Sequence, residues 1–285
     1  MTYQTLIDVD ALADLIEQGR AILFDCRFDL TDVHAGRSAY LQGHIPGAFY
    51  IDLEQDLSGT PDGHNGRHPL PDRAAFAARM AALGVSDGLQ VVGYDTSGGF
   101  YASRLWWMLR WAGHRDVAVL DGGLAAWTAA GKTLVTGEEP VRATGTFRMS
   151  ADPAMGAVDV RAIQANLGSG EALLIDARTP ERFAGQPHPL DATSGHIPGA
   201  ANRFYQRNMD GDSRFKPAEE LRREFAAILG DAGPEQVVHQ CGSGVTATHN
   251  LLAMEIAGLT GSQLYPGSWS EWTSNPTRPI ATGSD

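Results

Sequence analysis

The sequence repeats one ordered series of motifs, and this internal duplication restricts the possible folds more than any other feature. Each half carries an apolar strand ending in Asp-x-Arg, a His-Ile-Pro-Gly-Ala turn, a second apolar strand, and a segment ending in tryptophan. The first series is Ala21–Arg27, His44–Ala48, Gln90–Asp95 and Leu120–Trp127. The second series is Ala172–Arg178, His196–Ala200, Gln236–Cys241 and Leu264–Trp272. Two unrelated α/β domains that merely share turn chemistry would rarely repeat this order, so we predict two copies of one domain.

The segments between these motifs alternate short apolar runs with stretches of helical periodicity. The predicted helices are Asp10–Gln18, Ala74–Leu83, Ala102–Trp111 and Ala218–Leu229. Alternating strand and helix patterns indicate a parallel sheet flanked by helices. Residues 136–150 are polar, contain Pro and Gly, and lack periodicity, which is typical of a linker. We therefore expect an α/β protein with tandem domains at 1–135 and 151–285.

The charge balance limits the class of partner. The chain has 22 basic and 34 acidic residues and a net charge of −12, so a concentrated basic surface for nucleic acid is not expected. Hydrophobic residues make up 43% of the chain, as in ordinary folded proteins. An anionic substrate would be repelled at long range. Any anion site must therefore use local arginines and backbone dipoles.

The two cysteines, Cys26 and Cys241, are too few for a disulfide framework or a cysteine metal site. The first eight residues lack the basic and apolar segments of a signal peptide, and no apolar run is long enough for a membrane span. We therefore expect a cytoplasmic protein with no membrane partner, in a reducing compartment where a reactive thiol survives.

Cys241 lies between a predicted strand, Gln236–Gln240, and a predicted helix, Thr248–Ile256. Backbone N–H groups and the positive end of a helix converge at such a position, which favours thiolate over thiol and can hold an anion. Gly242 and Gly244 let the backbone fold tightly around the sulfur. A lone cysteine is more often a small buried hydrophobe, but the Gly-x-Gly context after a strand favours a functional role.

The loop lacks the arginine that closes the Cys-x5-Arg loop of cysteine phosphatases and arsenate reductases, where it clamps the oxyanion. The sixth position after Cys241 is Ala247, and Thr248 follows it. A phosphoester or arsenate substrate is therefore disfavoured. The pattern fits better a nucleophile that itself becomes the anionic group, a cysteine persulfide.

The loop Cys-Gly-Ser-Gly-Val-Thr-Ala at 241–247 resembles the active loop of 3-mercaptopyruvate sulfurtransferases, within the two-domain rhodanese (thiosulfate sulfurtransferase) family. Three further motifs carry the resemblance, at 43–48, 195–200 and 265–272. It covers nearly the whole chain. It implies transfer of sulfur from a small anionic donor, with 3-mercaptopyruvate favoured, to a thiol or cyanide acceptor through a Cys241 persulfide. No metal or organic cofactor is implied.

Two alternatives stay open at this point. Thiosulfate could be the donor, as in rhodanese itself, or the chain could be a non-catalytic module that binds or senses sulfur. An oxyanion hydrolase is a weaker third alternative, because the loop arginine is missing.

The resemblance also assigns roles around the nucleophile. The backbone of the loop would bind the donor and the persulfide through Gly242, Gly244, Val245, Thr246 and Ala247. Ser243 would bind the donor by its hydroxyl and relay a proton with His68. The acid partner of that relay falls on Glu54, with Asp52 as an alternative. The alternatives are that Ser243 fills a turn and, on local evidence, that His68 is an exposed loop histidine with no catalytic role.

Arg182 matches the family's substrate-binding arginine and would bind the carboxylate of the donor. An ordinary structural or solvated cation is the alternative. Mercaptopyruvate enzymes carry a second arginine nine positions later, where this chain has Asp191. This departure leaves the donor open.

The duplication predicts that the first domain is catalytically silent, because Asp95 stands where the second copy has Cys241. A carboxylate cannot accept a sulfane sulfur. The histidines of the repeated turn, His44 and His196, occur in both copies, so we expect them to shape turns. Cys26 aligns with a strand alanine and is expected to be an inert buried thiol.

Overall fold

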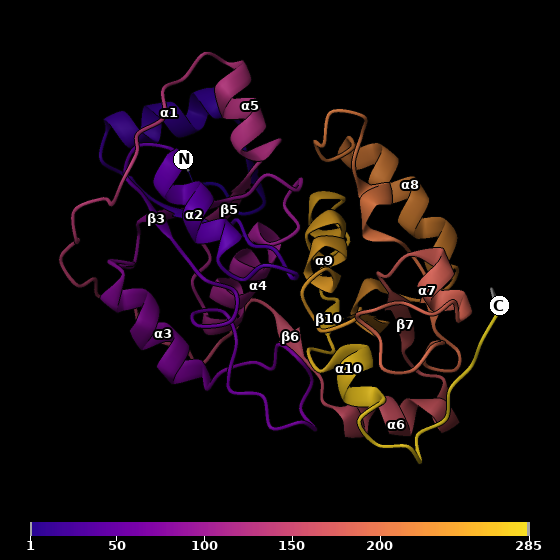
Figure 1. Cartoon of the computed structure of the whole chain (residues 1–285). Helices are drawn as coiled ribbons and strands as arrows, with labels where there is room; N and C mark the ends of the chain where they lie inside the picture. Colours follow the sequence, from indigo (N-terminus) through magenta and orange to yellow (C-terminus); the bar gives the residue numbers. More distant parts are fainter. Residues whose placement is uncertain (1, 284–285) are drawn as a thin grey trace. The chain divides into compact units, whose positions relative to one another are not determined.

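The computed structural model describes residues 2–283, which form two compact units (Figure 1). The first unit contains the residues up to Ser58, Pro71–Ala154 and Asp210–Phe215. The second contains Gly59–Leu70, Met155–Met209 and the residues from Lys216 onward. These units differ from the expected limits in two segments: Gly59–Leu70 of the N-terminal half belongs to the second unit, and Asp210–Phe215 of the C-terminal half belongs to the first.

The first unit contains a five-stranded parallel sheet in the order β1-β5-β4-β2-β3. Its strands are β1 (Leu6–Ile7), β2 (Ala21–Asp25), β3 (Ala48–Tyr50), β4 (Gln90–Tyr94) and β5 (Val117–Leu120). Its helices are α1 (Val9–Glu17), α2 (Ala35–Gln42), α3 (Arg73–Ala82), α4 (Ala102–Ala112) and α5 (Gly123–Ala129).

Side chains alternate between the two faces of this sheet, so each face buries a different set of helices. Leu23 and Val92 pack with Leu12 of α1 and Trp127 of α5 in one core cluster. On the other face, Gly93 of β4 lies against α4, and a Cβ atom there would be 3.3 Å from the side chain of Leu105. Both faces are therefore covered, as an all-parallel sheet requires.

The second unit repeats this topology with the sheet order β6-β10-β9-β7-β8. Its strands are β6 (Gly156–Ala157), β7 (Leu173–Asp176), β8 (Ala201–Asn202), β9 (Val237–Gln240) and β10 (Gln263–Leu264). Its helices are α6 (Val160–Ser169), α7 (Pro180–Ala184), α8 (Ala218–Leu229), α9 (Ala247–Ile256) and α10 (Ser268–Trp272), with short 3-10 turns η1 (Tyr205–Asn208) and η2 (Pro234–Gln236). The predicted fold class, two α/β domains with parallel sheets flanked by helices, is confirmed.

The repeated Asp-x-Arg motif has the same structural role in both units. Arg178 binds the carboxylate of Asp176 through Nε and Nη2 and donates from Nη2 to the carbonyl of Gly195 at 2.8 Å. Arg27 makes the equivalent bonds to Asp25 and to the carbonyl of Gly43. The motif thereby ties the end of one strand to the turn that precedes the next strand.

The histidines of the repeated turn are fully buried and bonded to backbone. Nδ1 of His44 lies 2.9 Å from the carbonyl of Tyr40, and Nδ1 of His196 lies 2.8 Å from the carbonyl of Phe183. Each ring also stacks on the aromatic ring of that same partner. These contacts agree with a turn-shaping role in both copies.

The segment expected to be a linker, residues 136–150, packs on the first unit and forms no helix or strand within the described chain. The N–H of Gly145 donates to the carbonyl of Ala81 at 2.7 Å. A Cβ at Gly145 would lie 2.0 Å from the carbonyl oxygen of Val85, so only glycine allows this close approach.

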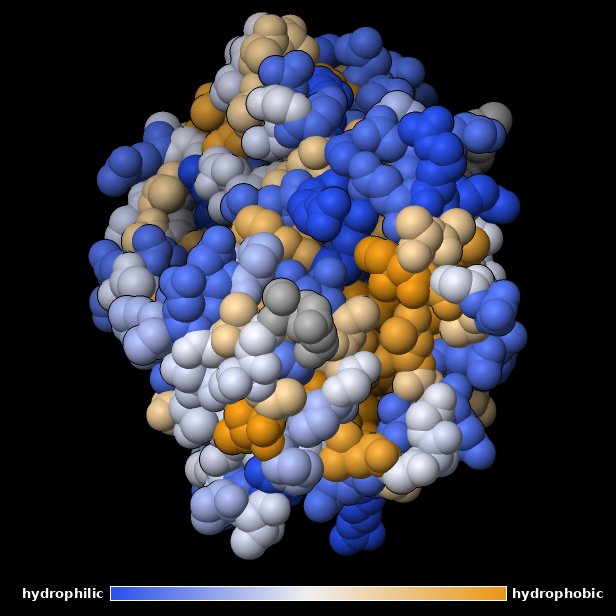
Figure 2. Space-filling view, turned by 90° about the vertical axis from the view of Figure 1, so that its right-hand side faces the viewer, coloured by the Kyte–Doolittle hydropathy of each residue, from blue (hydrophilic) through white to orange (hydrophobic). Residues whose placement is uncertain are grey.

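Figure 2 shows one face of the molecule, on which apolar residues gather in a strip bordered by polar ones. The exposed large apolar side chains of the second unit include Leu167 and Ile280. Apolar atoms contribute roughly half of the accessible surface of ordinary folded proteins, so such residues need no special explanation. Over residues 2–283, the structure contains no helix with the length and apolar character needed to cross a bilayer.

Candidate active site

Cys241 lies at the carboxyl edge of the second sheet, between the end of β9 and the start of α9. Its side chain is almost fully buried. The N–H of Cys241 donates to Oγ of Ser268 at 3.1 Å, and its carbonyl accepts from the N–H of Trp269 at 2.9 Å. The carbonyl of Gly242 accepts from the N–H of Ser270 at 3.0 Å. Helix α10 therefore fixes the start of the cysteine loop.

The remainder of the loop presents buried backbone donors. Among the residues that the structure describes, the N–H groups of Ser243, Val245 and Ala247 make no hydrogen bond to protein, although these residues are 5%, 3% and 0% exposed. Gly244 has φ +76°, and a Cβ there would lie 2.3 Å from the carbonyl oxygen of Pro266. The glycine thus allows the tight turn, and the turn leaves N–H groups that can bind an anion.

The first unit contains an equivalent loop, in which a side-chain carboxylate accepts hydrogen bonds from the backbone N–H groups. Asp95 follows β4 as Cys241 follows β9, and its carboxylate is buried. Oδ1 accepts from the N–H groups of Ser97 and Gly99 at 2.8 and 2.9 Å, and Oδ2 accepts from those of Tyr101 and Ala102 at 2.8 and 3.0 Å. A loop of this build therefore binds one negative charge with four backbone donors.

His68 lies beside the loop, on the segment Gly59–Leu70 of the second unit. Its Nδ1 is 2.8 Å from Oγ of Ser243, and both side chains are buried. Gly66 holds this segment close, because it has φ +89° and a Cβ there would lie 2.8 Å from the carbonyl oxygen of Gly267. The structure thus brings together the two residues that the resemblance paired.

The two candidates for the acid of that relay, Glu54 and Asp52, belong to the other unit. Glu54 is exposed and belongs to the first unit, whereas His68 belongs to the second. Asp52 uses Oδ1 to accept from the N–H groups of Glu54 and Gln55 at 2.8 and 2.9 Å, which fixes the turn after β3. Neither carboxylate lies within the unit that holds Cys241, so the acid partner stays a prediction.

Arg182, on α7, forms a bidentate ion pair with Asp191. Its Nε is 2.7 Å from Oδ2, and its Nη2 is 2.6 Å from Oδ1. Nη1 of Arg178 lies 3.5 Å from the same Oδ2. Burial alone would raise the pKa of the Asp191 carboxyl, but the hydrogen bonds and charge of Arg182, with the charges of Arg178 and Arg67, hold it below its usual value. Asp191 therefore stands at the position where mercaptopyruvate enzymes carry a second arginine, and its carboxylate pairs with Arg182, the first arginine.

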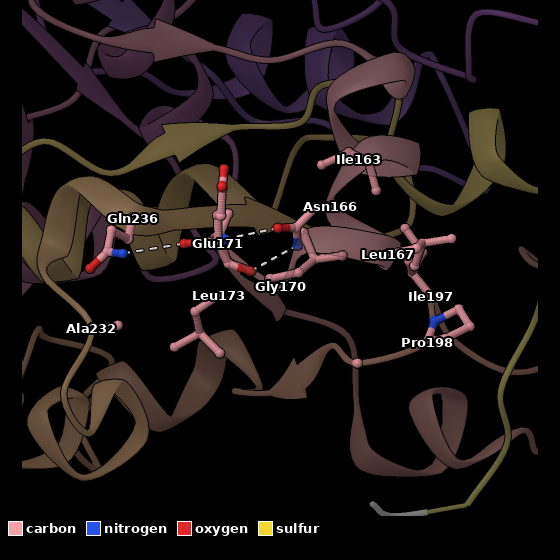
Figure 3. A pocket seen from close by; sticks show the side chains of 13 residues that line it. Ile163, Asn166, Leu167, Gly170, Glu171, Leu173, Ile197, Pro198, Ala232 and Gln236 are labelled. Carbon is pink, nitrogen blue, oxygen red and sulfur yellow. Dashed lines mark hydrogen bonds between the residues drawn. The ribbon is translucent and has the colours of Figure 1, made fainter.

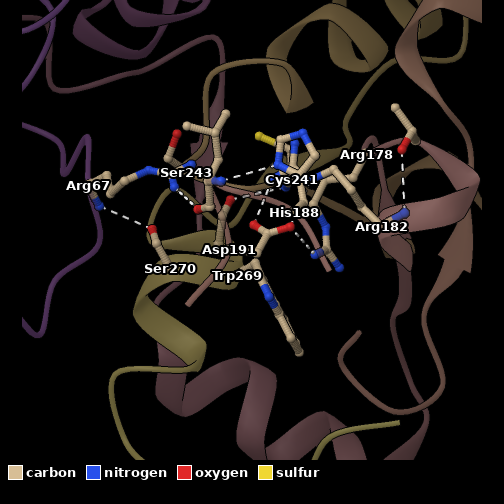
Figure 4. Close-up of polar contacts among 12 residues, drawn as sticks. Arg67, Arg178, Arg182, His188, Asp191, Cys241, Ser243, Trp269 and Ser270 are labelled. Carbon is tan, nitrogen blue, oxygen red and sulfur yellow. Dashed lines mark hydrogen bonds and ion pairs between the residues drawn. The ribbon is translucent and has the colours of Figure 1, made fainter. Parts of the chain in front are cut away.

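Arg67 is a site residue that the sequence reasoning missed. A Cβ built on Gly242 would lie 3.1 Å from Nη2 of Arg67 and 3.0 Å from Nη2 of Arg182, so both guanidiniums converge beside the nucleophile (Figure 4). Burial lowers the pKa of Arg67, while the charges of Asp191 and Cys241 oppose that change. Its place next to His68 in Gly-Arg-His-Pro was the signal that could have identified it.

Sheet register explains why these side chains meet. Asp176, the last residue of β7, pairs with Gln240, the last residue of β9. The chain after β7 supplies Arg178 and Arg182, and the chain after β9 supplies Cys241. Both therefore emerge at one edge of the sheet, where ligands bind in open α/β folds.

A pocket of about 340 Å³ lies at the opposite, amino-terminal edge of the same sheet (Figure 3). Its lining includes Leu173 at the start of β7 and Gln236 just before β9. Asn166 bonds both the N–H and the carbonyl of Ala172 there at 2.8 Å. The pocket contains none of the candidate catalytic residues, so it is separate from the cysteine site.

Cys26 differs from Cys241 in its surroundings. Burial raises the pKa of its thiol, and the charges of Asp95 and Asp25 raise it further. A buried neutral thiol is a poor nucleophile, in line with the inert role expected for Cys26. Within residues 2–283, no cluster of three or more His, Cys, Asp or Glu side chains could hold a metal ion.

Comparison with known families identifies this arrangement. The model of the rhodanese-like domain matches residues 8–130 and again residues 159–275. The chain belongs to the rhodanese family. The two matches coincide with the two repeated sheets, and the second contains the cysteine loop.

Full-length relatives of this rhodanese-family chain are sulfurtransferases. A Pseudomonas aeruginosa protein named "Probable 3-mercaptopyruvate sulfurtransferase" is 45% identical over 285 residues, covering 99% of this chain and 100% of that protein. The thiosulfate sulfurtransferase of Gallus gallus is 33% identical over 277 residues, covering 94% and 93%. The 3-mercaptopyruvate sulfurtransferase from Leishmania major superposes with a TM-score of 0.83 at 32% identity, over 97% of this chain and 75% of that one. The predicted enzyme class, sulfurtransferase, is confirmed.

Proposed function

We propose that this chain moves a sulfur atom from 3-mercaptopyruvate to a thiol or cyanide acceptor through a persulfide on Cys241. The observation that carries the proposal is the set of buried, unbonded N–H groups of Ser243, Val245 and Ala247. In the equivalent loop of the first unit, such N–H groups bind the carboxylate of Asp95. The loop after Cys241 has the same build as a loop that binds an anion, and a persulfide supplies one.

The first step is nucleophilic attack by the Cys241 thiolate on the sulfur of the donor. The S–S bond forms as the C–S bond of mercaptopyruvate breaks, and the electron pair of that bond passes to the carbon as the enolate of pyruvate. The proton of the donor thiol ends on that carbon, which gives pyruvate. The loop N–H groups stabilise the negative charge on the outer sulfur.

The second step returns the enzyme to its starting state. A thiolate or cyanide attacks the outer sulfur, the S–S bond breaks, and Cys241 leaves as thiolate. The products are an acceptor persulfide or thiocyanate. Over the two steps, the carbon of the donor is reduced and the acceptor is oxidised by the same two electrons, so no external oxidant is needed.

Ser243 and His68 are suited to move the proton in the first half-reaction. Their 2.8 Å separation is within reach for general acid–base catalysis. Burial keeps water away from the pair, so a proton that leaves the donor thiol passes through Ser243 to His68 and returns to the enolate carbon. Glu54, or Asp52, is the acid proposed to orient His68.

Local charge supports a monoanionic donor. Among the described residues, the guanidiniums of Arg67, Arg178 and Arg182 face the carboxylates of Asp176 and Asp191 and the sulfur of Cys241, so one positive charge is left to be shared by the Cys241 thiolate and the donor. The residues after the nucleophile, Gly242 and Ser243, are neutral. A carboxylate needs one such charge, whereas thiosulfate carries two negative charges. Thiosulfate is the second candidate donor, because relatives with that name cover most of this chain.

The first domain is proposed to be catalytically silent. Asp95 cannot form a persulfide, and its carboxylate already uses four loop donors. Catalysis is thus assigned to the domain around 151–285, completed by the segment Gly59–Leu70. The free thiols of Cys26 and Cys241 suit a reducing compartment such as the cytoplasm.

Mass spectrometry of the intact protein tests the proposal. Incubation with 3-mercaptopyruvate should add the mass of one sulfur atom, and cyanide should then remove it as thiocyanate. Cys241→Ser should abolish both changes, because a serine hydroxyl is not ionised near neutral pH and forms no persulfide. Cys26→Ser is the matched control and should load normally. Loading without discharge would favour a sulfur-sensing module, and equal loss in both variants would contradict the assignment of the nucleophile.

A further inference from the structure

We propose that Asn208 is a positioning residue, which orients the N–H groups of the cysteine loop through the first turn of α9. Its side chain is fully buried at the end of η1 and bonds to α9, the helix that follows the cysteine loop. The inference rests on the sulfur transfer proposed above, because it concerns the N–H groups that would bind the persulfide. It adds to the site a residue that lies outside the loop and outside the repeated motifs.

The amide of Asn208 joins a buried arginine to α9. Oδ1 of Asn208 accepts from Nε and Nη2 of Arg203 at 3.2 and 3.0 Å. On the other side, Nδ2 of Asn208 donates to Oδ1 of Asn250 at 2.7 Å and to Nδ1 of His249 at 3.1 Å. All four side chains are buried. Because a guanidinium only donates, the amide oxygen of Asn208 faces Arg203 and its nitrogen faces α9.

This network is fixed from α8 as well. Nη2 of Arg203 donates to Oε2 of Glu224 at 2.6 Å, and Nδ2 of Asn250 donates to the carbonyl of Arg203 at 2.9 Å. The carbonyl of Asn208 accepts from the N–H of Lys216 at 2.9 Å, and Nζ of Lys216 donates to Oε1 of Glu224 at 2.6 Å. The backbone and the side chain of Asn208 are thus both held. Truncation at this position would leave buried polar groups unpaired.

The first turn of α9 sets the direction of the last peptide units of the loop. The N–H of His249 donates to the carbonyl of Thr246 at 3.2 Å. A peptide unit is planar, so this bond also fixes the N–H of Ala247, which shares the peptide unit with that carbonyl. Thr248 binds the carbonyl of Val245 through its N–H and its Oγ1, which fixes the N–H of Thr246 in the same way. Displacement of His249 would therefore turn loop donors away from the anion.

The test compares Asn208→Ala with a matched loss elsewhere in the same unit, on purified full-length protein. Asn166, on α6, bonds both the N–H and the carbonyl of Ala172 at 2.8 Å, at the opposite edge of the sheet. Asn166→Ala therefore removes two amide hydrogen bonds without touching α9. Asn250→Ala is a milder second variant, because alanine has the highest helix propensity and the bond from Asn208 to His249 remains.

Hydrogen–deuterium exchange of peptides covering residues 241–250 measures the order of the loop without any substrate. We expect exchange there to rise by about tenfold in Asn208→Ala, since the loss of buried hydrogen bonds favours local opening. For transfer from 3-mercaptopyruvate to cyanide, kcat should fall by about tenfold and KM should stay within about threefold, because a misdirected donor weakens mainly the transition state. Asn250→Ala should change the same quantities by smaller factors, and Asn166→Ala should match the wild type in all of them.

The failure of this inference is distinguishable from the failure of the proposed function. A wild type that neither loads nor transfers sulfur would overturn the proposed function, whereas the exchange comparison needs no activity. Wild-type exchange in a folded Asn208→Ala, or raised exchange with an unchanged kcat, would overturn the role of Asn208. Equal losses in Asn166→Ala would also overturn it, because general loosening of the unit would then explain both. If Asn208→Ala does not fold, wild-type exchange and kcat in Asn250→Ala would overturn the role.

Discussion

The carboxylate of Asp191 holds the guanidinium of Arg182 in a fork, 2.7 Å from Nε and 2.6 Å from Nη2. Nη1 of Arg178 approaches the same carboxylate at 3.5 Å. Asp191 is thus the bidentate partner of Arg182 and a second, longer-range partner of Arg178, whose main counter-ion is Asp176. Its removal leaves Arg182 without a counter-ion in a partly buried setting, whereas Arg178 keeps Asp176.

We expect Asp191→Asn to lower the free energy of unfolding by about 3 kcal/mol, the lower range for breaking a buried ion pair. The pH dependence should change as well. The folded-state pKa of Asp191 lies below its ordinary value, so its stabilising effect is complete above the unfolded pKa of about 3.9 and is lost as the pH falls through the folded pKa. Urea titrations between pH 2 and pH 7 should show a shallower acid loss in Asp191→Asn. Parallel curves for the two proteins would contradict this role.

The hydrogen bond between His68 and Ser243 should act as one unit in catalysis. We expect Ser243→Ala and His68→Gln each to lower kcat by about a hundredfold, within the range for general acid–base groups. The double variant should lose about as much as the more impaired single variant, because either change breaks the relay. Steady-state transfer to cyanide measures this cycle. Simple multiplication of the two losses would mean that the residues act independently.

The local charge of the site should appear in the choice of donor. We expect kcat/KM for 3-mercaptopyruvate to exceed that for thiosulfate by at least about tenfold, ~1.4 kcal/mol of transition-state discrimination. Asp191→Asn should reduce this ratio of kcat/KM values, because it removes one negative charge from the site and so favours binding of the thiosulfate dianion. Side-by-side kinetics with cyanide as acceptor check both expectations. Thiosulfate used equally well by the wild type would assign donor choice to other groups.

The buried carboxylate of Asp95 should be a stability determinant of the first unit. We expect Asp95→Ala to cost at least about 3 kcal/mol in free energy of unfolding, since it leaves four backbone donors of the loop without an acceptor. Asp95→Asn, which keeps one oxygen acceptor, should cost less. Urea unfolding followed by circular dichroism ranks the variants, and an Asp95→Ala protein as stable as the wild type would refute the expectation.

The repeated motifs were sufficient to predict the fold, because local pattern and domain order agree in both halves. The helix expected at Ala218–Leu229 is α8, residue for residue. The expected limit of the first domain failed to anticipate Gly59–Leu70, since the packing of Gly66 against Gly267 joins residues two hundred positions apart. No local pattern encodes such a contact.

The site was predicted only in part, because some of its residues are marked by local motifs and others are placed by long-range contacts. Cys241 stands in a motif whose chemistry follows from neighbouring residues, so it was found directly. Arg67 was missed because its role depends on two distant partners, Leu190 and Ser270. Asp191 was noticed as a departure from relatives, but its pairing with Arg182 depends on the path of the chain from Gly185 onward, which has no periodicity to read.

The bonded carboxylate of Asp95 has an evolutionary consequence. In a duplicated domain, a copy without the cysteine has a loop whose N–H groups still require an acceptor. An apolar replacement would leave those donors unsatisfied, whereas the two carboxylate oxygens of aspartate accept from all four of them. Loss of chemistry and retention of the fold can therefore be achieved by the same residue. Selection for stability alone is enough to explain why a carboxylate stands at position 95.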